Sequence, residues 1–314
     1  MPICEADLWR LQYFERAHCP PDVNIPTEDS DAWLWYPEHR WVYDKIAIAR
    51  SQGLAAAPHG VSPPRFPVFS KPITNLKGMG VGSRVLRSAD EYETSSTAGH
   101  MWMPLLEGRH VSSDVAVVEG EPRWWRHVTG APGAEGTFDH WTVHAARDAA
   151  VEDYCGAWIG RHLGGYTGIL NIETIGGRMI EVHLRMSDQW PDLYGAGWVD
   201  AVVKLYHRRR WDFPDTDRRD GVSVVLFGPH GPRYRHPPAA LVEEVRRMPD
   251  VSSVQITFHE DKDPEQHAMP PGGFRLAVVN AFSLDTGRAG RDVLRRHFLP
   301  QGTAVIGAPD TTSV

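Results

Sequence analysis

Hydrophobic and polar positions alternate along two runs within residues 168–185, on either side of a glycine pair at 176–177. Alternation with a period of two is typical of β-strands, and a Gly-Gly pair is a frequent turn between antiparallel strands. Successive side chains of a strand point to opposite faces, so the pattern predicts a β-hairpin with one apolar and one polar face. The polar face holds Asn171 and Glu173 from the first run, and Glu181, His183 and Arg185 from the second.

The geometry of the turn decides whether the two polar rows meet. A two-residue turn places Glu173 opposite Ile180 and sends Glu173 and Glu181 to opposite faces, whereas a three-residue turn or a β-bulge places the two glutamates directly opposite each other. Opposed carboxylates repel, so a dry pair needs a proton or a cation between them, and such oxygen ligands suit Mg²⁺ or Mn²⁺. A solvated polar face is the alternative, and this segment alone favours it.

The pattern elsewhere predicts a mixture of helices and strands. Apolar positions at helical spacing predict a short helix near residues 7–17 and helices at 39–53, 149–163, 197–207, 238–248 and 284–298. Runs rich in β-branched and aromatic residues predict strands at 65–72, 83–86, 113–118, 123–128, 221–227, 252–258 and 273–280. The glycine-rich stretch 129–140 is long enough to act as a lid. We therefore expect an α+β fold of antiparallel sheets covered by helices.

Composition and charge restrict the class of protein. The net charge of −7 argues against a nucleic-acid or membrane-surface binder, so neither partner is expected. The three cysteines, Cys4, Cys19 and Cys155, form no CxxC motif and no even set, which fits a reducing cytoplasm better than a disulfide framework. No apolar run is long enough for a membrane span, and the N-terminus lacks the pattern of a signal peptide. We expect a cytoplasmic protein.

A glycine-rich loop with two lysines follows the predicted strand at 65–72. Lys71 ends that strand, and Lys77, Gly78 and Gly80 lie in the loop. Alternating glycines let backbone N–H groups approach phosphate oxygens closely, and the lysines supply positive charge. The GxxxxGK[ST] motif of a P-loop is absent. The loop is a candidate phosphate site, with an ordinary turn as the alternative.

Four segments follow one another in a particular order. The first, 43–45, holds a lysine at the start of a helix, and the second, 66–72, holds the lysine before the glycine-rich loop. The third, 101–110, is an apolar run that ends in Leu-Glu-Gly-Arg-His, and the fourth holds Glu173 and Glu181, eight positions apart. In this order and spacing, over roughly residues 40–205, the chain resembles the ATP-grasp superfamily, and the glutamate spacing is similar to that of its glutathione-synthetase-like members.

The resemblance implies an ATP site and a metal site. Glu173 and Glu181 would hold Mg²⁺, or Mn²⁺, against the β- and γ-phosphates, with His183 in place of the usual asparagine as third metal ligand. Arg185 and Lys71 would act in catalysis, Arg185 by stabilising an oxyanion near the acyl phosphate. The residues implied to contact ATP are Lys45, Lys71, Lys77, Gly78, Gly80, Met103, Leu105 and Glu107.

The resemblance also implies an ATP-grasp fold in which two antiparallel-sheet subdomains grip the nucleotide, with a C-terminal α/β extension. The expected parts are an irregular N-terminal segment (1–40), a small subdomain with the glycine-rich loop (41–110), a metal and catalytic subdomain (111–212) and a C-terminal α+β subdomain (213–314). Most members of the superfamily have a full N-terminal domain that helps to bind substrate. Here that domain is abbreviated, so its role would fall to another region or to a partner chain.

The activity implied is that of a carboxylate–amine ligase, which forms an amide through an acyl phosphate. Its partners would be small-molecule or peptide carboxylates and amines, with Arg161 and Asn171 as further candidates for substrate contact, and the chain could act alone or as a homodimer. A small-molecule kinase on the same fold is one alternative. A non-catalytic nucleotide-binding regulatory protein is another, because of His183 and the abbreviated N-terminal domain.

Overall fold

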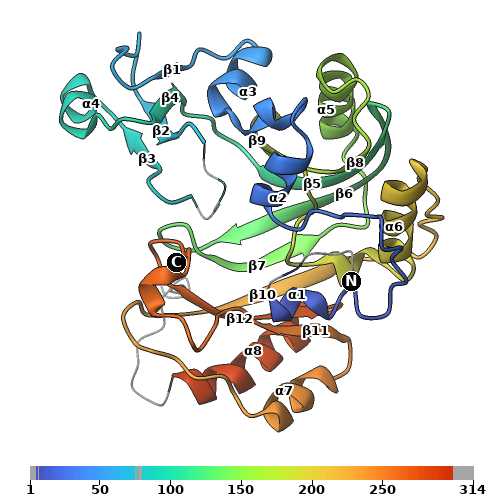
Figure 1. Cartoon of the computed structure of the whole chain (residues 1–314). Helices are drawn as coiled ribbons and strands as arrows, with labels where there is room; N and C mark the ends of the chain where they lie inside the picture. Colours follow the sequence, from blue (N-terminus) through green and yellow to red (C-terminus); the bar gives the residue numbers. More distant parts are fainter. Residues whose placement is uncertain (1–4, 6, 75, 77–79, 300–314) are drawn as a thin grey trace.

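Two antiparallel sheets form the frame of the protein (Figure 1). The computed structural model describes residues 5, 7–74, 76 and 80–299. The four-stranded sheet has the order β1-β4-β2-β3, with β1 at Ala57–Pro58, β2 at Val68–Pro72, β3 at Arg84–Leu86 and β4 at His100–Pro104. The eight-stranded sheet has the order β11-β12-β10-β7-β6-β5-β8-β9. Its strands are β5 (His110–Val118), β6 (Glu121–Pro132), β7 (Phe138–Val143), β8 (Gly168–Ile175), β9 (Arg178–His183), β10 (Gly221–Gly228), β11 (Val251–Ile256) and β12 (Phe274–Ala281).

Helices cover the larger sheet and flank the smaller one (Figure 1). The α-helices are α1 (Leu8–Leu11), α2 (Asp29–Trp35), α3 (Lys45–Ser51), α4 (Ala89–Ser95), α5 (Ala149–His162), α6 (Trp198–Arg208), α7 (Ala239–Arg246) and α8 (Leu284–Phe298). Short 3₁₀ helices are η1 (Arg40–Tyr43), η2 (Pro191–Tyr194) and η3 (Pro264–Gln266). The α+β architecture predicted from the sequence is confirmed, and no helix in the described ranges is both long and apolar enough to cross a membrane.

The eight-stranded sheet crosses the boundary predicted at residues 212 and 213. Strand β7 pairs with β10 from Gly221↔Val143 to Val224↔His140, so strands from 110–183 and from 221–281 form one continuous sheet. The division into subdomains stays a prediction, but any C-terminal subdomain shares backbone hydrogen bonds with the strands before it. Residues on β10 and β12 are thereby fixed relative to those on β5 and β8.

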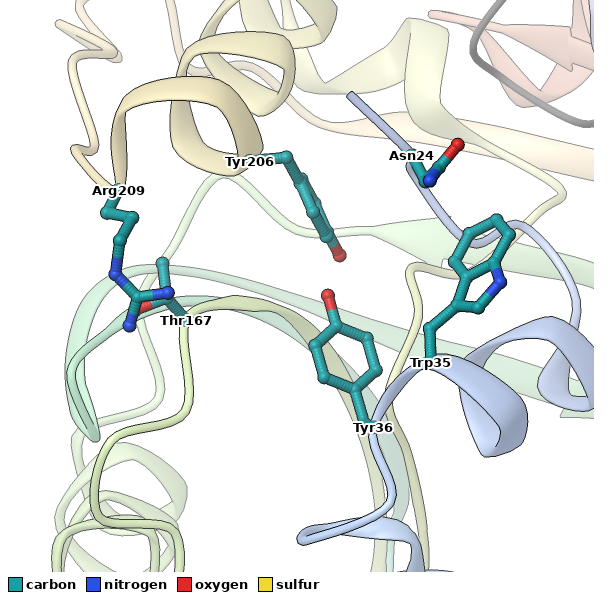
Figure 2. A pocket seen from close by; sticks show the side chains of 6 residues that line it. All are labelled: Asn24, Trp35, Tyr36, Thr167, Tyr206 and Arg209. Carbon is teal, nitrogen blue, oxygen red and sulfur yellow. The ribbon is translucent and has the colours of Figure 1, made fainter. Parts of the chain in front are cut away.

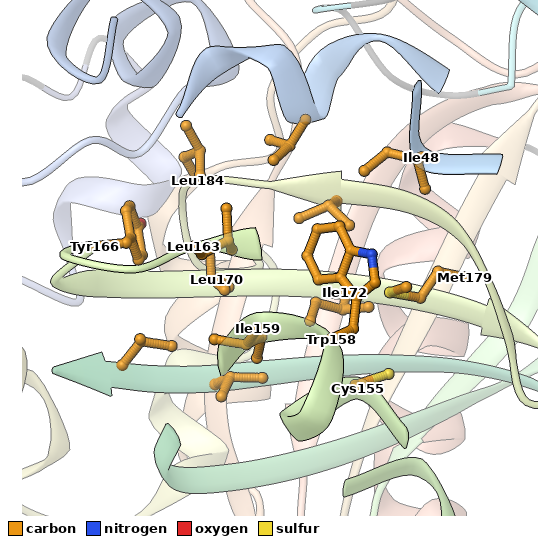
Figure 3. Packing of buried hydrophobic residues seen from close by; sticks show 14 of the residues in the cluster. Ile48, Cys155, Trp158, Ile159, Leu163, Tyr166, Leu170, Ile172, Met179 and Leu184 are labelled. Atoms are coloured by element: carbon orange, nitrogen blue, oxygen red, sulfur yellow. The ribbon is translucent and has the colours of Figure 1, made fainter. Parts of the chain in front are cut away.

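Alternating residues of the central strands supply two cores on opposite faces of the sheet. On one face, Leu170 and Ile172 of β8 pack with Trp158 and Ile159 of α5 (Figure 3). On the other face, Ile169 packs in a separate cluster with residues of α6, among them Trp198 and Leu205. All of these side chains are nearly inaccessible to solvent. Burial on both faces fixes the register of β8, because a one-residue slip would exchange the two sets of side chains.

Two elements differ from the expectation in an instructive way. The helix predicted at 39–53 is divided by Asp44, whose side chain accepts hydrogen bonds from the backbone N–H groups of Ile46 and Ala47 and so caps α3. The lid predicted at 129–140 is wrong: β6 and β7 extend into it and leave only residues 133–137 between them. Gly130 serves packing instead, because a Cβ there would lie 2.5 Å from the Phe138 ring.

Candidate functional site

The hairpin of β8 and β9 brings the two glutamates opposite each other. Glu173 pairs with Glu181 and Asn171 pairs with His183, in the predicted register. The turn itself has two residues, with positive φ at both Gly176 and Gly177, as a type I′ turn requires. A β-bulge on β9 then inserts one extra residue between the pairs Thr174↔Met179 and Glu173↔Glu181. The bulge therefore places Glu173 opposite Glu181, as a three-residue turn would also have done.

The same turn docks against the connection between the two sheets. A Cβ added at Gly176 would lie 2.2 Å from the carbonyl oxygen of Glu107, and the Gly176 N–H donates to the carbonyl of Arg109 at 3.1 Å. Only glycine allows this close backbone contact. The glycine pair thus anchors the hairpin to residues 105–109 between β4 and β5, which we call the hinge, a role that turn chemistry alone did not indicate.

Two of the three predicted lysines, Lys45 and Lys71, reach the polar end of the hairpin. The Lys45 ammonium lies 2.7 Å from a Glu181 carboxylate oxygen, and the Lys71 ammonium donates to the Ile180 carbonyl at 2.8 Å. Burial works to raise the pKa of Glu181, but nearby positive charge, above all that of Lys45, holds that pKa well below its usual range. Burial lowers the pKa of Lys71 to about 8. The two lysines and Glu181 form a compact, largely dry charge cluster.

His110 is a site residue that the sequence did not single out. It begins β5, and its Nε2 donates a hydrogen bond to Glu173 Oε2 at 3.0 Å. Burial works to lower the pKa of His110, but this hydrogen bond outweighs it and raises that pKa above its ordinary value. Glu173 is held from one side by His110, while Glu181 is held from the other by Lys45.

The N-terminal segment supplies a second residue that sequence reasoning missed. Asp29 is nearly inaccessible and accepts hydrogen bonds from Tyr43 Oη at 3.1 Å, His183 Nδ1 at 3.0 Å and Arg185 Nη2 at 2.9 Å. Burial works to lower the pKa of His183, but the charge of Asp29 outweighs it and raises that pKa to about 9. The His183 Nε2 lies 3.5 Å from Glu181 Oε2. His183 is therefore held as a cation between two carboxylates.

These contacts decide which side chains suit a divalent metal. Carboxylate oxygens are suitable ligands for Mg²⁺, and Glu173 and Glu181 face each other across the hairpin. A protonated imidazole has no free lone pair, so His183 in its present charge state is a hydrogen-bond donor rather than a ligand. Within the described ranges, the ligand atoms of three acidic or histidine side chains converge to within 4.8 Å only at Glu5, Asp7 and Glu28. The donor set of the hairpin therefore fits a metal through its two glutamates.

One cavity of about 810 Å³ connects these groups. Its apolar end is formed by residues of both sheets, and Lys71, Glu173, Glu181, His183 and Arg185 also line the cavity. The apolar end is lined by Phe69, Leu76, Met103, Leu105, Leu106, Ile175 and Ile180. Gly80 also lines the cavity, whereas Glu107 is exposed at the hinge and does not. Lys77 and Gly78 lie outside the described residues.

The two further candidates for substrate contact have different positions. Asn171 lines the cavity, where its amide donates to Ser112 Oγ at 2.9 Å and to Asp114 Oδ1 at 2.8 Å. Arg161 is exposed on α5 and does not line the cavity. The structure thus brings Asn171, but not Arg161, to the predicted site.

The free edge of β9 is covered by side chains rather than by another strand. The side-chain amide of Gln52 accepts from the Met179 N–H at 3.0 Å and donates to the Met179 carbonyl at 2.6 Å. The Lys71 ammonium donates a hydrogen bond to the Ile180 carbonyl. Just after β9, the Leu184 N–H donates to Tyr43 Oη at 3.2 Å. All three covering side chains belong to the segment that includes the small sheet.

A second, shallower hollow of about 360 Å³ lies between α2, α6 and the start of β8. Figure 2 shows the Tyr36 and Tyr206 hydroxyl groups pointing toward one another across it, with Trp35 at its side. Arg209 at its rim is paired with Glu119, and no titratable group of the hairpin reaches it. This hollow is separate from the cavity of the candidate site.

Comparisons with known proteins agree on the fold. No protein-family model matches the sequence, and no curated protein matches it. Phosphoribosylamine–glycine ligase from Thermotoga maritima superposes with a TM-score of 0.58 at 15% identity, covering 85% of this chain and 79% of that one. Carboxyaminoimidazole ribonucleotide synthase from Aspergillus clavatus, complexed with ATP, gives 0.57 at 12% identity, covering 82% and 74%. L-amino acid ligase from Bacillus licheniformis gives 0.54 at 13% identity, covering 81% and 69%.

These similarities establish a class of fold. The chain has an ATP-grasp fold like that of carboxylate–amine ligases, as the sequence predicted. The similar proteins are named as ligases or synthases, and one of them was solved with ADP and an aminoimidazole ribonucleotide. Identities of 11–15% extend this likeness to the fold and not to a particular reaction.

Proposed function

We propose that this chain is an ATP-dependent carboxylate–amine ligase that forms an amide through an acyl phosphate. One observation carries the proposal: Glu173 and Glu181 face each other beside Lys45 and Lys71, where an apolar slot opens into the same cavity. An apolar slot suits a nucleotide base, and a cluster of lysines and carboxylates suits a metal–triphosphate group. The fold supports the assignment, because residues of both sheets line this cavity.

Each residue has a role in this scheme. Met103 and Leu105 of the slot would pack on the adenine, and the loop around Gly80 would cover the phosphates. Lys71 and Lys45 would neutralise phosphate charge, and both are positioned by contacts with β9. Arg185, held by Asp29 at 2.9 Å, would present its guanidinium to the substrate carboxylate. A pKa near 8 keeps Lys71 mostly protonated at neutral pH.

Glu173 and Glu181 would hold Mg²⁺. The ion would supply neutralisation of the charge that develops as the phosphoryl group transfers. His110 and Lys45 hold the two carboxylates from either side, so their oxygens are oriented before any ion binds. His183 would act as a hydrogen-bond donor to phosphate or to Glu181 rather than as the third ligand.

The reaction balances without a covalent group on the protein. The bond between the γ-phosphorus and its bridging oxygen breaks to release ADP, while an oxygen of the substrate carboxylate bonds to that phosphorus. An amine nitrogen then attacks the acyl carbon, phosphate leaves with the bonding electron pair, and the amine proton passes to phosphate or water. The protein's own contribution is positioning and charge stabilisation.

The proposal is tested by ADP release in the presence of Mg-ATP with mixed carboxylates and amines. Wild-type protein should release ADP only when both an acid and an amine are present, and Glu181→Gln should lower the rate by at least about a hundredfold. Glu121→Gln is the matched control, because Glu121 is exposed at the start of β6 and does not line the cavity. A stable phosphorylated product formed without amine, or full activity of Glu181→Gln, would contradict the ligase assignment.

A further inference from the structure

The end of the cavity beyond the paired glutamates is lined by aromatic side chains and one arginine. We call this end the distal pocket and define it by Phe138, Trp141, Trp190, Phe227 and Arg275. The ring centroids of Phe138 and Trp141 lie 4.2 Å apart, and those of Trp141 and Trp190 lie 5.4 Å apart. Phe227 of β10 is directly opposite Arg275 of β12, so their side chains share one face of the sheet.

Arg275 forms no ion pair among the described residues, although the charges of Asp188, Asp7 and Glu28 act on it from further away. In the part of the chain that the structure describes, no carboxylate lies within 4.0 Å of its guanidinium, and its Nε is buried without a hydrogen-bond partner. Among the described residues, its guanidinium makes one hydrogen bond, a long one of 3.4 Å to Gln189 Oε1. The nearby acid Asp188 is already bonded to Arg10 at 2.8 Å. A partly buried cation in this state is stabilised by an incoming anion.

Arg185 differs from Arg275 in this respect. Its guanidinium is bound to Asp29 at 2.9 Å and lies beside the reacting centre of the proposed ligase. Strands β8 and β12 are separated by β5, β6, β7 and β10 in the sheet. Both arginines nevertheless line the same cavity, and both lie near Asp188, since their charges both lower the pKa of that carboxyl. They are separate groups that one ligand with two charged ends can reach.

An aromatic wall nevertheless connects the two regions. His110, which donates to Glu173, has its ring centroid 5.8 Å from that of Trp141. Trp141 in turn contacts Trp190, and Gln189 next to it contacts both Ser223 and Arg275. A ligand that reaches from the glutamates to Arg275 therefore passes along apolar and aromatic surface.

We propose that the distal pocket binds a second, non-reacting carboxylate of a substrate whose body is aromatic or apolar. The inference rests on the proposed ligase function and names its substrate class. A guanidinium offers two parallel N–H donors to a carboxylate, and the rings of the pocket provide a face for an aromatic body. The carboxylate could belong to the acid that is activated or to the amine that attacks it.

Calorimetric binding to the full chain without nucleotide tests this inference. The probes are para-phenylenediacetate, with two carboxylates, para-aminomethylphenylacetate, with a carboxylate and an amine, and para-methylphenylacetate, which keeps the ring but has only one charged group. At least one bifunctional probe should bind roughly tenfold to a hundredfold more tightly than para-methylphenylacetate. Tighter binding of the diacid assigns the pocket to the acid substrate, and tighter binding of the amine probe assigns it to the acceptor.

Variants of Arg275 identify the group responsible. Arg275→Gln should abolish the preference for a bifunctional probe, and Arg275→Lys should keep part of it because the charge remains. Arg247→Gln is the matched control, since Arg247 is exposed at the end of α7 and does not line the cavity. Far-ultraviolet circular dichroism and thermal unfolding verify that each variant is folded.

Three results would overturn the inference. These are equal affinity of wild-type protein for all three probes, no binding of either bifunctional probe, and an unchanged preference in Arg275→Gln. Failure of the ligase proposal is distinguishable, because probe binding is measured on wild-type protein without nucleotide and does not depend on whether any ADP is released. Probe binding with no turnover would refute the ligase proposal alone, and turnover without the Arg275-dependent preference would refute this inference alone.

Discussion

Replacement of Asp29 by Asn should destabilise the protein in a way that depends on pH. Asp29 is 3% exposed and its carboxylate is shared by Tyr43, His183 and Arg185. Asparagine keeps the shape of the side chain but removes the charge that balances two buried cations. Removal of one partner from a buried ion pair costs about 3–5 kcal/mol. We therefore expect Asp29→Asn to lower the free energy of unfolding at pH 6.5 by about this amount.

The pH dependence follows from His183. Its pKa is raised from 6.5 to about 9, so the stabilisation is fully present below pH 6.5 and is lost as pH rises through 9. A shift of this size is worth about 3 kcal/mol, with no large discount for solvent because the imidazole is 6% exposed. The difference between wild type and Asp29→Asn should therefore narrow by about 2–3 kcal/mol between pH 6.5 and pH 9.

Urea unfolding followed by tryptophan fluorescence at several pH values measures this difference. Asp31→Asn is the matched control, because Asp31 is also in the first turn of α2 but makes no ion pair within the described ranges. Its stability should change by less than about 1 kcal/mol at every pH, the size of a helix-dipole contribution. If Asp29→Asn lowers the free energy of unfolding by the same amount at pH 6.5 and at pH 9, the assignment of a positive charge to His183 is refuted.

Two further predictions concern the hairpin and its core. Gly176→Ala should cost about 2–4 kcal/mol in urea unfolding, because its Cβ would meet the Glu107 carbonyl, whereas Gly177→Ala, with open space around it, should cost only about 1 kcal/mol. Equal costs would contradict the docking of the turn on the hinge. Leu170→Ala should cost about 2–5 kcal/mol as a core cavity forms, against less than about 0.5 kcal/mol for Leu34→Ala at an exposed position, and similar values would contradict the packing in Figure 3.

The parts of the fold with strong local patterns were predictable. Alternation located β8 and β9, and the helical periodicities located α5 and α8 within a residue or two of their ends. Predicting that Glu173 pairs with Glu181 required one added assumption, that the hairpin has a bulge or a three-residue turn. The sequence contains no marker of the bulge itself, because its extra residue is set by the contacts of the hinge and the core rather than by turn chemistry.

The residues that complete the site had no local signal. Asp29 and His183 form a hydrogen bond although they are 154 positions apart in the sequence, and His110 and Glu173 do so at a separation of 63. Each is a single polar residue in an unremarkable stretch, so only the folded chain reveals its partner. Residues 1–40 were expected to be an irregular segment with no part in the site, yet they supply Asp29 and Arg10 to the cavity. Likewise, the alternating pattern that predicts β12 gives no indication that Arg275 lines the cavity.

The covering of β9 has a consequence for how the protein behaves in solution. β9 is the last strand of the eight-stranded sheet, and its outward backbone groups are satisfied by Gln52, Lys71 and Tyr43. If Lys71 of the small sheet and Gln52 move away from β9, the strand presents unpaired N–H and C=O groups at Met179 and Ile180, the usual template for edge-to-edge aggregation. A nucleotide that holds the two sheets together would then also protect against self-association, so added Mg-ATP should keep concentrated samples monodisperse.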